Sequence, residues 1–347
     1  YRRLAADNPD AFMPDLAMSL NNLSITYGDV GRRHEALVAI EEAVEIRRRL
    51  AADDPDAFMA DLAASLNNLS ARYGEVGRWQ EALVAIEEAV EIRRRLAADN
   101  PDAFLPDLAA SLNNLGNRLL DAGRLSEAMR ANEEAVELYR RLATASPSAF
   151  AADLSAALSN AAGVHLALGD LERAISLYEQ SLADSVRVLG PDHPDTLLAR
   201  NNLAGAYESA GDLTRALSLY EHTLADSVRV LGPDHPDTLL ARNNLAGVYA
   251  MADNVEPAIA LYERTLADRV RVLGASHPHT LTSQGNLAGA YALAGDLARA
   301  VSLYEQTLAE CARILGEQHP MIQGIRNNLA YWQDKARSKH VDTSTDS

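Results

Sequence analysis

The chain repeats one sequence unit along almost its whole length. The stretch NNLAGAYESAGDLTRALSLY begins at Asn201, returns as NNLAGVYAMADNVEPAIALY at Asn243, and has a looser copy, GNLAGAYALAGDLARAVSLY, at Gly285. Self-similarity of this kind is typical of solenoids, in which each unit buries surface only against its neighbours. The repeat therefore constrains the fold more strongly than the length of 347 residues does.

Two repeat lengths follow one another. In the first block, the motif LAADNPDAF and its variants begin at Leu4, Leu50, Leu96 and Leu142, which is a spacing of 46 residues. In the second block, the motif LGPDHPDT begins at Leu189 and Leu231, a spacing of 42, and weaker copies follow at the same interval. We expect the blocks to span residues 1–148 and 149–336, followed by a disordered tail at 337–347.

One asparagine runs through both blocks, so the core of the unit is continuous across the change in period. We expect only the linker and the end of the second helix to shorten. Numbering every unit so that this asparagine is position 6 gives the equivalent residues Asn22, Asn68, Asn114, Asn160, Asn202, Asn244, Asn286 and Asn328.

Each unit predicts two helices, A and B. Helix A is expected to begin at a proline, which suits the first helical turn, at Pro14, Pro106, Pro194, Pro236 and Pro278. It is expected to end at a glycine in the left-handed conformation, at Gly31, Gly77, Gly123, Gly169, Gly211 and Gly295. The sixth unit has Asp253-Asn254 there, the next best residues for that conformation. Seven A/B pairs and a capping helix at about 321–336 follow.

Small residues at Ala204 and Ala216, with large ones at Leu203, Tyr207 and Tyr220, resemble the tetratricopeptide repeat (TPR). The combination of LGPDHPDT with NNLA resembles the kinesin-light-chain subclass. The 46-residue units resemble arrays of large actinobacterial proteins, some of which place the repeats after a signalling NTPase domain. The resemblance covers residues 1–336 and implies an all-α, right-handed superhelix (α-solenoid) that binds peptides or proteins.

A helical wheel divides helix A into two faces. Positions 3, 7 and 11 fall on the face that packs against neighbouring helices, whereas positions 2, 5, 6, 9, 12 and 13 fall on the opposite face, named here the groove face. Position 9 is mostly small. Position 13 is acidic in the first block, at Asp29, Glu75 and Asp121, and neutral in the second.

Positions 5 and 6 place a pair of asparagines on the groove face in most units. An amide side chain both donates and accepts, so an asparagine ladder is able to hold the backbone of an extended peptide. The TPR resemblance implies peptide contact at Asn22, Asn68, Asn114, Asn202, Asn244 and Asn328. The alternative is that the asparagines bond to the next repeat and fix its stacking. The predicted groove residues are Asn21, Asn22, Asn67, Asn68, Asn113, Asn114, Asn201, Asn202, Asn243, Asn244, Asn327 and Asn328.

The positions of the charged residues and the net charge indicate which class of partner the chain binds. Kinesin-light-chain grooves take acidic peptides through basic residues, but Arg200, Arg242 and Arg326 lie at position 4, away from the groove face. An inward acidic ladder favours a basic or apolar peptide instead. The net charge of −17 argues against nucleic acid and anionic membranes. The single cysteine, Cys311, forms no intrachain disulfide, and no run of 18 apolar residues exists, so we expect a cytoplasmic protein.

The sequence predicts no enzyme, cofactor or metal site. The His-Pro ladder (His193, His235, His277 and His319) supplies one histidine per repeat, and neighbouring helices pack about 8–10 Å apart, too far for ligands of one ion. The arginine runs at 47–49 and 93–95 read as solvated faces near helix C-termini. No phosphate loop, HExxH or GxSxG motif is present, and Cys311 reads as a core residue.

The sequence therefore favours a non-enzymatic scaffold that binds a peptide or partner protein in its groove. The alternative is a sensor or autoinhibitory arm of a larger signalling NTPase. Since Tyr1-Arg-Arg-Leu matches Tyr139-Arg-Arg-Leu at the end of a helix B, the chain is expected to start inside a repeat. Self-association through that end is a further expectation.

Overall fold

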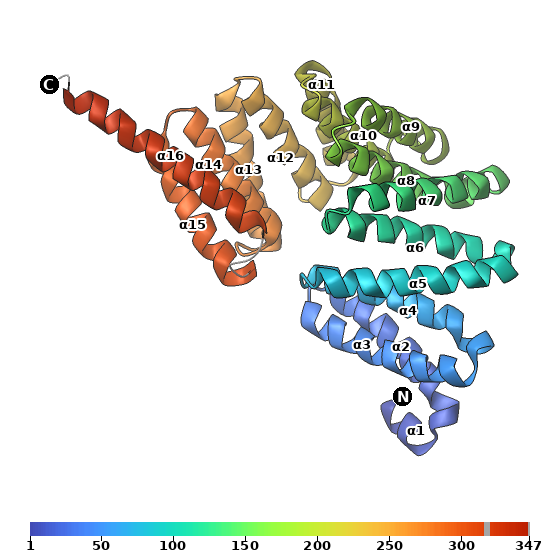
Figure 1. Cartoon of the computed structure of the whole chain (residues 1–347). Helices are drawn as coiled ribbons and strands as arrows, with labels where there is room; N and C mark the ends of the chain where they lie inside the picture. Colours follow the sequence, from blue (N-terminus) through green and yellow to red (C-terminus); the bar gives the residue numbers. More distant parts are fainter. Residues whose placement is uncertain (316–319, 346–347) are drawn as a thin grey trace. The chain divides into compact units, whose positions relative to one another are not determined.

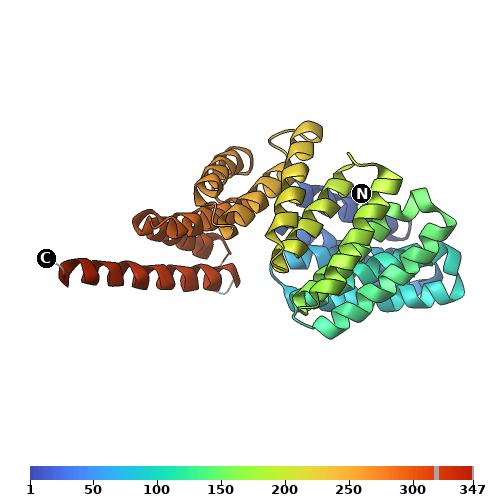
Figure 2. The same cartoon turned by 90° about the horizontal axis from the view of Figure 1, so that it is seen from above.

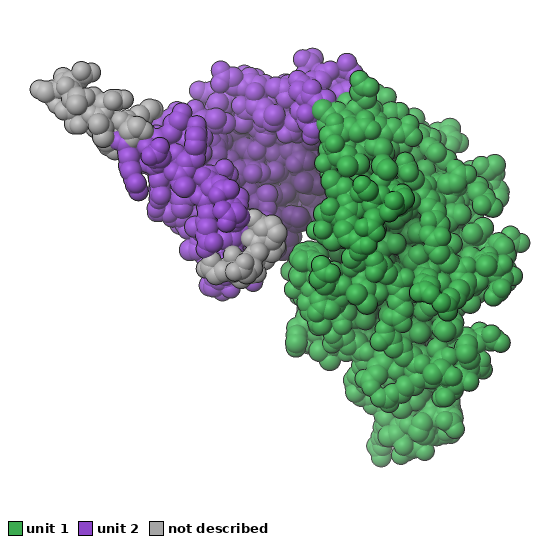
Figure 3. Space-filling model, in the orientation of Figure 1, with its two compact units in different colours: residues 1–188 green, residues 189–347 purple. Residues whose placement is uncertain are grey.

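The protein, described here from a computed structural model, is built from α-helices that follow one another in pairs (Figure 1). The structure describes residues 1–315 and 320–345. It forms two compact units, unit 1 at 1–188 and unit 2 at 189–347 (Figure 3). The all-α prediction is confirmed, since every described regular element is a helix.

Unit 1 contains the longer repeats. Its helices are α1 (Arg2–Asp7), α2 (Pro9–Asp29), α3 (Arg33–Asp53), α4 (Pro55–Glu75), α5 (Trp79–Asp99), α6 (Pro101–Asp121), α7 (Leu125–Ala145), α8 (Pro147–Ala167) and α9 (Leu171–Leu189). The helices A are α2, α4, α6 and α8, and each is followed by its helix B.

Unit 2 contains the shorter repeats. Its helices are α10 (Pro194–Ser209), α11 (Leu213–Val230), α12 (Pro236–Met251), α13 (Val255–Leu273), α14 (Pro278–Leu293), α15 (Leu297–Leu315) and α16 (Pro320–Thr345). The helices A are α10, α12, α14 and α16.

The change of period arises differently from the prediction. Each helix A of unit 1 has 21 residues, whereas α10, α12 and α14 have 16. The linker before helix A is a single residue in unit 1, such as Asp54, and lengthens to 190–193 or 231–235 in unit 2. The expectation that the linker shortens is therefore wrong: helix A loses its first turns, and a loop replaces part of them. The expected shortening of helix B is confirmed, since α3, α5 and α7 have 21 residues, whereas α11 has 18 and α13 and α15 have 19.

The long helices A begin at Pro9, Pro55, Pro101 and Pro147, five residues before the predicted start. Pro14 and Pro106 lie inside α2 and α6. All four have this earlier proline in the first helical turn, which it suits. In α4 and α6 the N-cap adds to it, because the side chains of Asp54 and Asn100 accept hydrogen bonds from the backbone N–H groups of Ala57 and Ala103.

The His-Pro motif of unit 2 is also an N-cap. The Nδ1 atoms of His193, His235 and His277 each accept the N–H two residues later at 3.2 Å. In the same loop, Thr196 Oγ1 donates to the carbonyl of Gly190 at 2.8 Å. The structural interpretation of these three histidines is confirmed, while His319 lies outside the described residues. Among the described residues, no group of three or more His, Cys, Asp or Glu side chains is placed to hold a metal ion.

The turns between helices A and B follow the prediction. Gly31 (φ 75°), Gly211 (φ 77°) and their equivalents adopt positive φ, and Asp253 adopts φ 61° where the sixth unit lacks glycine. Pro257 lies in the first turn of α13, where its missing N–H is harmless. Each turn therefore reverses the chain in three residues.

The two ends of the chain differ from or extend the predictions. At the start, α1 occupies the place of the end of a helix B. At the other end, α16 continues to Thr345 rather than ending near Ala336, because no glycine or proline interrupts 337–345 (Figure 2). Residues 346 and 347 of the predicted disordered tail lie outside the described part.

Within each unit the helices form two layers. Each helix B packs between its own helix A and the next one, and successive helices A touch one another, as α2 does α4 and α12 does α14. The seams are closed by fully buried alanines such as Ala204, Ala216 and Ala258. The small residues predicted at positions 8 and 20 are thus confirmed as packing residues. Among the described residues, none of the helices is long and apolar enough to cross a membrane.

Candidate binding groove

The asparagine pairs form a ladder of side-chain hydrogen bonds between repeats. The second asparagine of one repeat donates from Nδ2 to Oδ1 of the first asparagine of the preceding repeat. The bonds are Asn68 to Asn21 (3.1 Å), Asn114 to Asn67 (3.0 Å), Asn160 to Asn113 (2.9 Å) and Asn244 to Asn201 (3.2 Å). The stacking role that the sequence left open is therefore present in the geometry, and Asn21, Asn201 and Asn243 are buried.

A buried arginine extends this ladder into the core. Arg47 Nη1 donates to the carbonyl of Asp61 (2.8 Å) and to Ser65 Oγ (2.5 Å), and Ser65 in turn donates to Asn21 Oδ1. The same relay recurs with Arg93, Ser111 and Asn67, and with Arg269, Ser283 and Asn243. Burial lowers the pKa of Arg269 to about 10, so it stays charged at neutral pH.

The interpretation of the arginine runs as solvated faces is wrong for their first members. Arg47 and Arg93 are each only 6 % exposed. They lie one residue before Arg48 and Arg94, which are exposed and pair with Glu88 and Glu134 of the next repeat. Because helix B turns 100° per residue, adjacent arginines point in different directions. The sequence gives no signal that the first one finds Ser65 or Ser111.

Two of the three acidic residues predicted to form a ladder on the groove face make ion pairs with arginines. Arg72 pairs with Glu75 at 3.0 Å, and Arg118 pairs with Asp121 at 3.3 Å. Burial raises the pKa of Asp121 above its ordinary value, against the opposing effect of Arg118. Asp29 is exposed and lacks an arginine at the equivalent position. The ladder therefore favours a basic partner less strongly than the sequence predicts.

Large apolar side chains stand exposed on the groove face. In unit 1 they are Met18 and Ile25. In unit 2 Met251 is 57 % exposed and Leu293 is 55 % exposed, the highest values among the described large apolar residues of that unit. Both occupy position 13, where unit 1 has acidic residues. Clustered exposed apolar side chains are typical of interaction surfaces.

Glycines and tyrosines shape this face in unit 2. A Cβ atom added at position 9 would lie 3.2 Å from a tyrosine hydroxyl of helix B, in the pairs Gly205 with Tyr220, Gly247 with Tyr262 and Gly289 with Tyr304. The glycines therefore let the tyrosine hydroxyls reach the groove face. Burial raises the pKa of Tyr262 to about 12, so its hydroxyl stays protonated at neutral pH.

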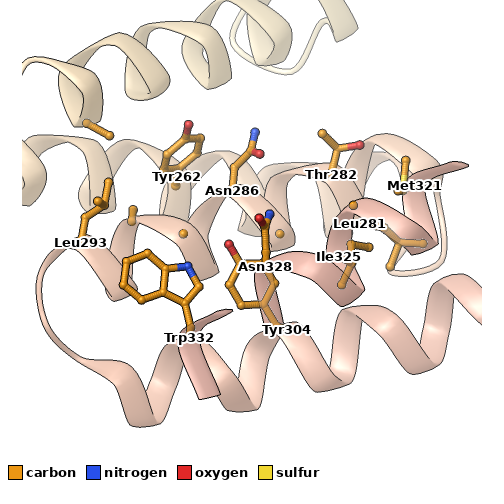
Figure 4. Close-up of a pocket in the computed structure, with 15 residues that line it drawn as sticks. Tyr262, Leu281, Thr282, Asn286, Leu293, Tyr304, Met321, Ile325, Asn328 and Trp332 are labelled. Atoms are coloured by element: carbon orange, nitrogen blue, oxygen red, sulfur yellow. The ribbon is translucent and has the colours of Figure 1, made fainter. Parts of the chain in front are cut away.

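A cavity of about 500 Å³ lies on this face between α12 and α16 (Figure 4). In Figure 4, Asn286 and Asn328 lie near its middle, Leu293 and Trp332 at one end, and Met321 and Ile325 at the other. Its lining also includes Ala250, Tyr262, Leu281, Thr282, Gly285, Gly289, Ala290, Tyr304 and Gly324. Most of the α14 lining residues occupy predicted groove-face positions.

Few of the predicted groove asparagines therefore lie at the cavity. Of the predicted groove asparagines only Asn328 lines the cavity, whereas Asn286, which was not predicted as a site residue, lines it as well. Asn327 lies outside the lining and accepts a hydrogen bond from Gln323. The sequence signal that was missed is Gly285, the one glycine at position 5 of the repeats.

The arginines at position 4 point away from the groove face, as the wheel predicts. Arg200 pairs with Asp226 at 2.7 Å, and Arg242 pairs with Asp268 at 2.6 Å, in both cases on the helix B of the same repeat. These arginines are held in ion pairs with helix B, and none of the residues that line the cavity is basic.

Family models for the tetratricopeptide repeat match residues 16–56, 61–141, 153–227, 200–269 and 258–311, which is most of the chain. The chain belongs to the tetratricopeptide repeat family. TPR arrays generally bind other proteins, and none of the models that match this TPR chain describes a catalytic domain. A comparison with curated proteins found no match.

Solved TPR structures are similar to this chain. A Podosopora anserina protein assigned to the kinesin light chains, with nearly identical TPR-like repeats, shares 30 % identity (TM-score 0.49; 59 % of this chain and 94 % of that chain covered). BtubC from P. vanneervenii shares 22 % identity (TM-score 0.56; 70 % and 94 % covered).

A more distant structure comes from a signalling protein. The Signal Transduction ATPase with Numerous Domains (STAND) from Pyrococcus horikoshii has a tetratricopeptide repeat sensor. It shares 15 % identity with this chain (TM-score 0.55), and the match covers 89 % of this chain and 45 % of that protein. At this identity the similarity concerns the TPR fold alone.

Proposed function

We propose that this TPR array is a non-enzymatic scaffold that binds a segment of a partner protein along the groove face of its A helices. The observation that carries the proposal is the exposure of Met251 and Leu293 on that face, beside the cavity. Exposed apolar side chains bordered by amides suit an extended protein segment, because they bind side chains while the amides bind its backbone.

The partner segment is apolar rather than strongly charged. The counter-charges of Glu75 and Asp121 weaken attraction for a basic peptide, and Arg200 and Arg242 are held by Asp226 and Asp268. Neither an acidic nor a basic partner would therefore find many free opposite charges on this face.

The test compares capture by two double variants. Met251→Glu/Leu293→Glu places charges on the groove face, and Val228→Glu/Val270→Glu places them at similarly exposed positions of the B helices. A partner captured from lysate of the source cells should be lost with the groove variant and kept with the control, while circular dichroism stays unchanged. Equal capture by both folded variants would contradict the proposal.

A second candidate function is the sensor arm of a signalling NTPase. The similarity to the P. horikoshii STAND sensor favours it at the level of the fold. A nucleotide-binding domain encoded directly upstream in the same gene would support this role, and a short upstream region without such a domain would remove it.

Self-association is the remaining partner proposal. Tyr1 and Leu4 are exposed at the first residues of unit 1, and a dimer of two copies would bury them against each other. Sedimentation of the chain at increasing concentration should then show dimers, which Leu4→Glu would abolish; a monomer throughout would exclude this contact.

A further inference from the structure

The cavity of unit 2 exists because two glycines stand where other repeats have side chains. Gly285 occupies position 5, which is asparagine at Asn201 and Asn243. Gly324 occupies position 2, which is leucine at Leu198 and Leu240. A Cβ atom added at Gly285 or Gly324 would meet nothing within 4 Å, so both glycines border open space rather than a close backbone contact.

Gly285 also interrupts the asparagine ladder. In four other repeats the asparagine at position 6 donates to an asparagine of the preceding repeat, as Asn244 does to Asn201. Asn328 has glycine in place of that acceptor, and it interacts with the hydroxyl of Tyr304 instead. Asn286 makes no side-chain hydrogen bond with any group in the described ranges 1–315 and 320–345, and Asn243, the equivalent acceptor in the preceding repeat, accepts from Ser283. Two amides with free bonding capacity therefore flank the cavity.

A tyrosine hydroxyl adds a third polar group. Tyr262 is 5 % exposed, lines the cavity, and donates to no group among the described residues. Its hydroxyl lies beneath Gly247 on the groove face, where it is available to donate a hydrogen bond. A ligand carbonyl on the groove face would satisfy it.

The remaining lining defines the chemistry of the occupant. None of the lining residues carries a charge, and the walls are Leu281, Ile325, Met321, Leu293 and Trp332. A charged side chain would be desolvated here without a counter-ion, which is unfavourable. A volume of about 500 Å³ also lies within the range of ordinary ligand clefts, roughly 300–1,000 Å³. The occupant is therefore large, apolar and uncharged.

We propose that the cavity between α12 and α16 is a subsite for one large apolar side chain of an extended partner segment, whose main chain is held by the amides of Asn286 and Asn328. This inference rests on the proposed groove-binding function and states which residue type the groove selects. Met251, which follows the lining residue Ala250, is exposed outside the cavity and extends the apolar surface, which favours an extended chain over a compact small molecule.

The probes are N-acetyl-leucinamide and N-acetyl-phenylalaninamide, compared with N-acetyl-lysinamide and the N-acetyl amide of glutamate. The chain contains two tryptophans, so in the Trp79→Phe background the fluorescence of Trp332 reports the cavity alone. We expect the apolar probes to bind saturably, with a Kd of about 1–10 mM for molecules of this size. The charged probes should bind at least tenfold more weakly.

Two variants fill the cavity with residues that other repeats carry. Gly285→Asn and Gly324→Leu should weaken binding of the apolar probes at least tenfold. Their thermal midpoints should stay equal or rise, since each replaces a helical glycine in open space. Ser209→Asn, an exposed groove-face change on α10 outside the cavity, is the matched control and should leave probe affinity unchanged.

The outcomes separate the inference from the function on which it rests. Absence of saturable binding, equal binding of the charged probes, or unchanged affinity in both filling variants would overturn the subsite, whatever the capture experiment gives. Probe binding that follows these expectations supports the subsite. Equal partner capture by the two double variants overturns the groove function and leaves the probe result as a measurement of the cavity itself.

Discussion

The helices of unit 1 and unit 2 pack in the same way, but the side chains that form the groove face differ between the units. In the first two repeats of unit 1, position 24 of helix B is Ile40 and Ile86, and position 9 of helix A carries side chains such as Ile25. In the last repeat of unit 1 (Gly163 with Tyr178) and in the first three repeats of unit 2, position 24 is tyrosine and position 9 is glycine, so hydroxyls replace methyl groups beneath the face. The packing of the two helix layers therefore determines the fold. A few positions in each repeat determine whether side chains fill the groove face or leave it open.

The largest expected effect concerns what the two units have in common. Arg93→Ala in unit 1 and Arg269→Ala in unit 2 each break the buried arginine–serine–asparagine relay. We expect each to lower the free energy of unfolding by about 2–3 kcal/mol, because Ser111 or Ser283 loses a charged donor in the core. Urea unfolding read by Trp79 for unit 1 and Trp332 for unit 2 measures both.

The matched control is Arg94→Ala, which removes an exposed ion pair with Glu134 and should cost less than about 0.5 kcal/mol. If Arg93→Ala were as mild as Arg94→Ala, the relay would contribute nothing to the packing that the units share.

A second prediction concerns the third repeat of unit 1. The fully buried amide of Asn132 has no hydrogen-bond partner among the described residues, and it packs against Gly116. The two preceding repeats have Ile40 and Ile86 at this place. Asn132→Ile should raise the free energy of unfolding by about 1–2 kcal/mol, because an unpaired buried amide is removed.

Denaturant unfolding measures this gain, and Gly116→Ser/Asn132→Ile, which copies Ser70 and Ile86, should retain it. A loss of stability in both variants would show that the amide of Asn132 is satisfied in solution and that this repeat is not an unfilled version of its neighbours.

A third prediction tests the turn that both units use. Asp253 holds φ at 61°, whereas the equivalent turns have glycine. Asp253→Gly should stabilise unit 2 by about 0.5–1 kcal/mol, and Gly211→Ala should destabilise it by about 1 kcal/mol, because only glycine adopts this φ without strain. Thermal unfolding followed by Trp332 fluorescence measures both. The same sign for both changes would refute the conformational explanation.

The smallest predicted effect is a difference between the two units in how their stability depends on pH. In unit 2, hydrogen bonds from Arg229, Arg271 and Arg313 hold the pKa values of Asp192, Asp234 and Glu310 below their ordinary range, to about 2 for Glu310, and burial raises that of Glu208. In unit 1, hydrogen bonds from Arg32 and Arg124 lower the pKa values of Glu35 and Glu127, and a backbone hydrogen bond together with Arg78 lowers that of Glu81, whereas burial raises those of Asp121 and Asp153.

A lowered pKa gives stability above the ordinary value of about 4, and this stability is lost as the pH falls through the lowered pKa. A raised pKa has the opposite effect. Between pH 5 and pH 2, the urea midpoint read by Trp332 should therefore fall more than the one read by Trp79. Equal losses would mean that these exposed pairs do not distinguish the units.

Periodicity was sufficient to predict the helices and the buried alanines, because every repeat buries the same positions. The predicted helix starts at Pro14 and Pro106 were wrong, since Pro9 and Pro101 begin these helices five residues earlier and each motif offers two prolines as start signals. The helical wheel predicted the groove face but not the cavity. The cavity forms because Gly285 and Gly324 have no side chains and because no side chain of a neighbouring repeat fills the space that results.

The most direct test of the account is photo-crosslinking from single positions. A benzophenone amino acid at Met251 or Leu293 samples the open groove face of unit 2, and one at Val270 samples an exposed position on the B helix of the same unit. The account predicts that the captured partner crosslinks from Met251 and Leu293 through one apolar segment, and that Gly285→Asn weakens the crosslink from Leu293. Crosslinks from Val270 with none from Met251 or Leu293 would contradict it.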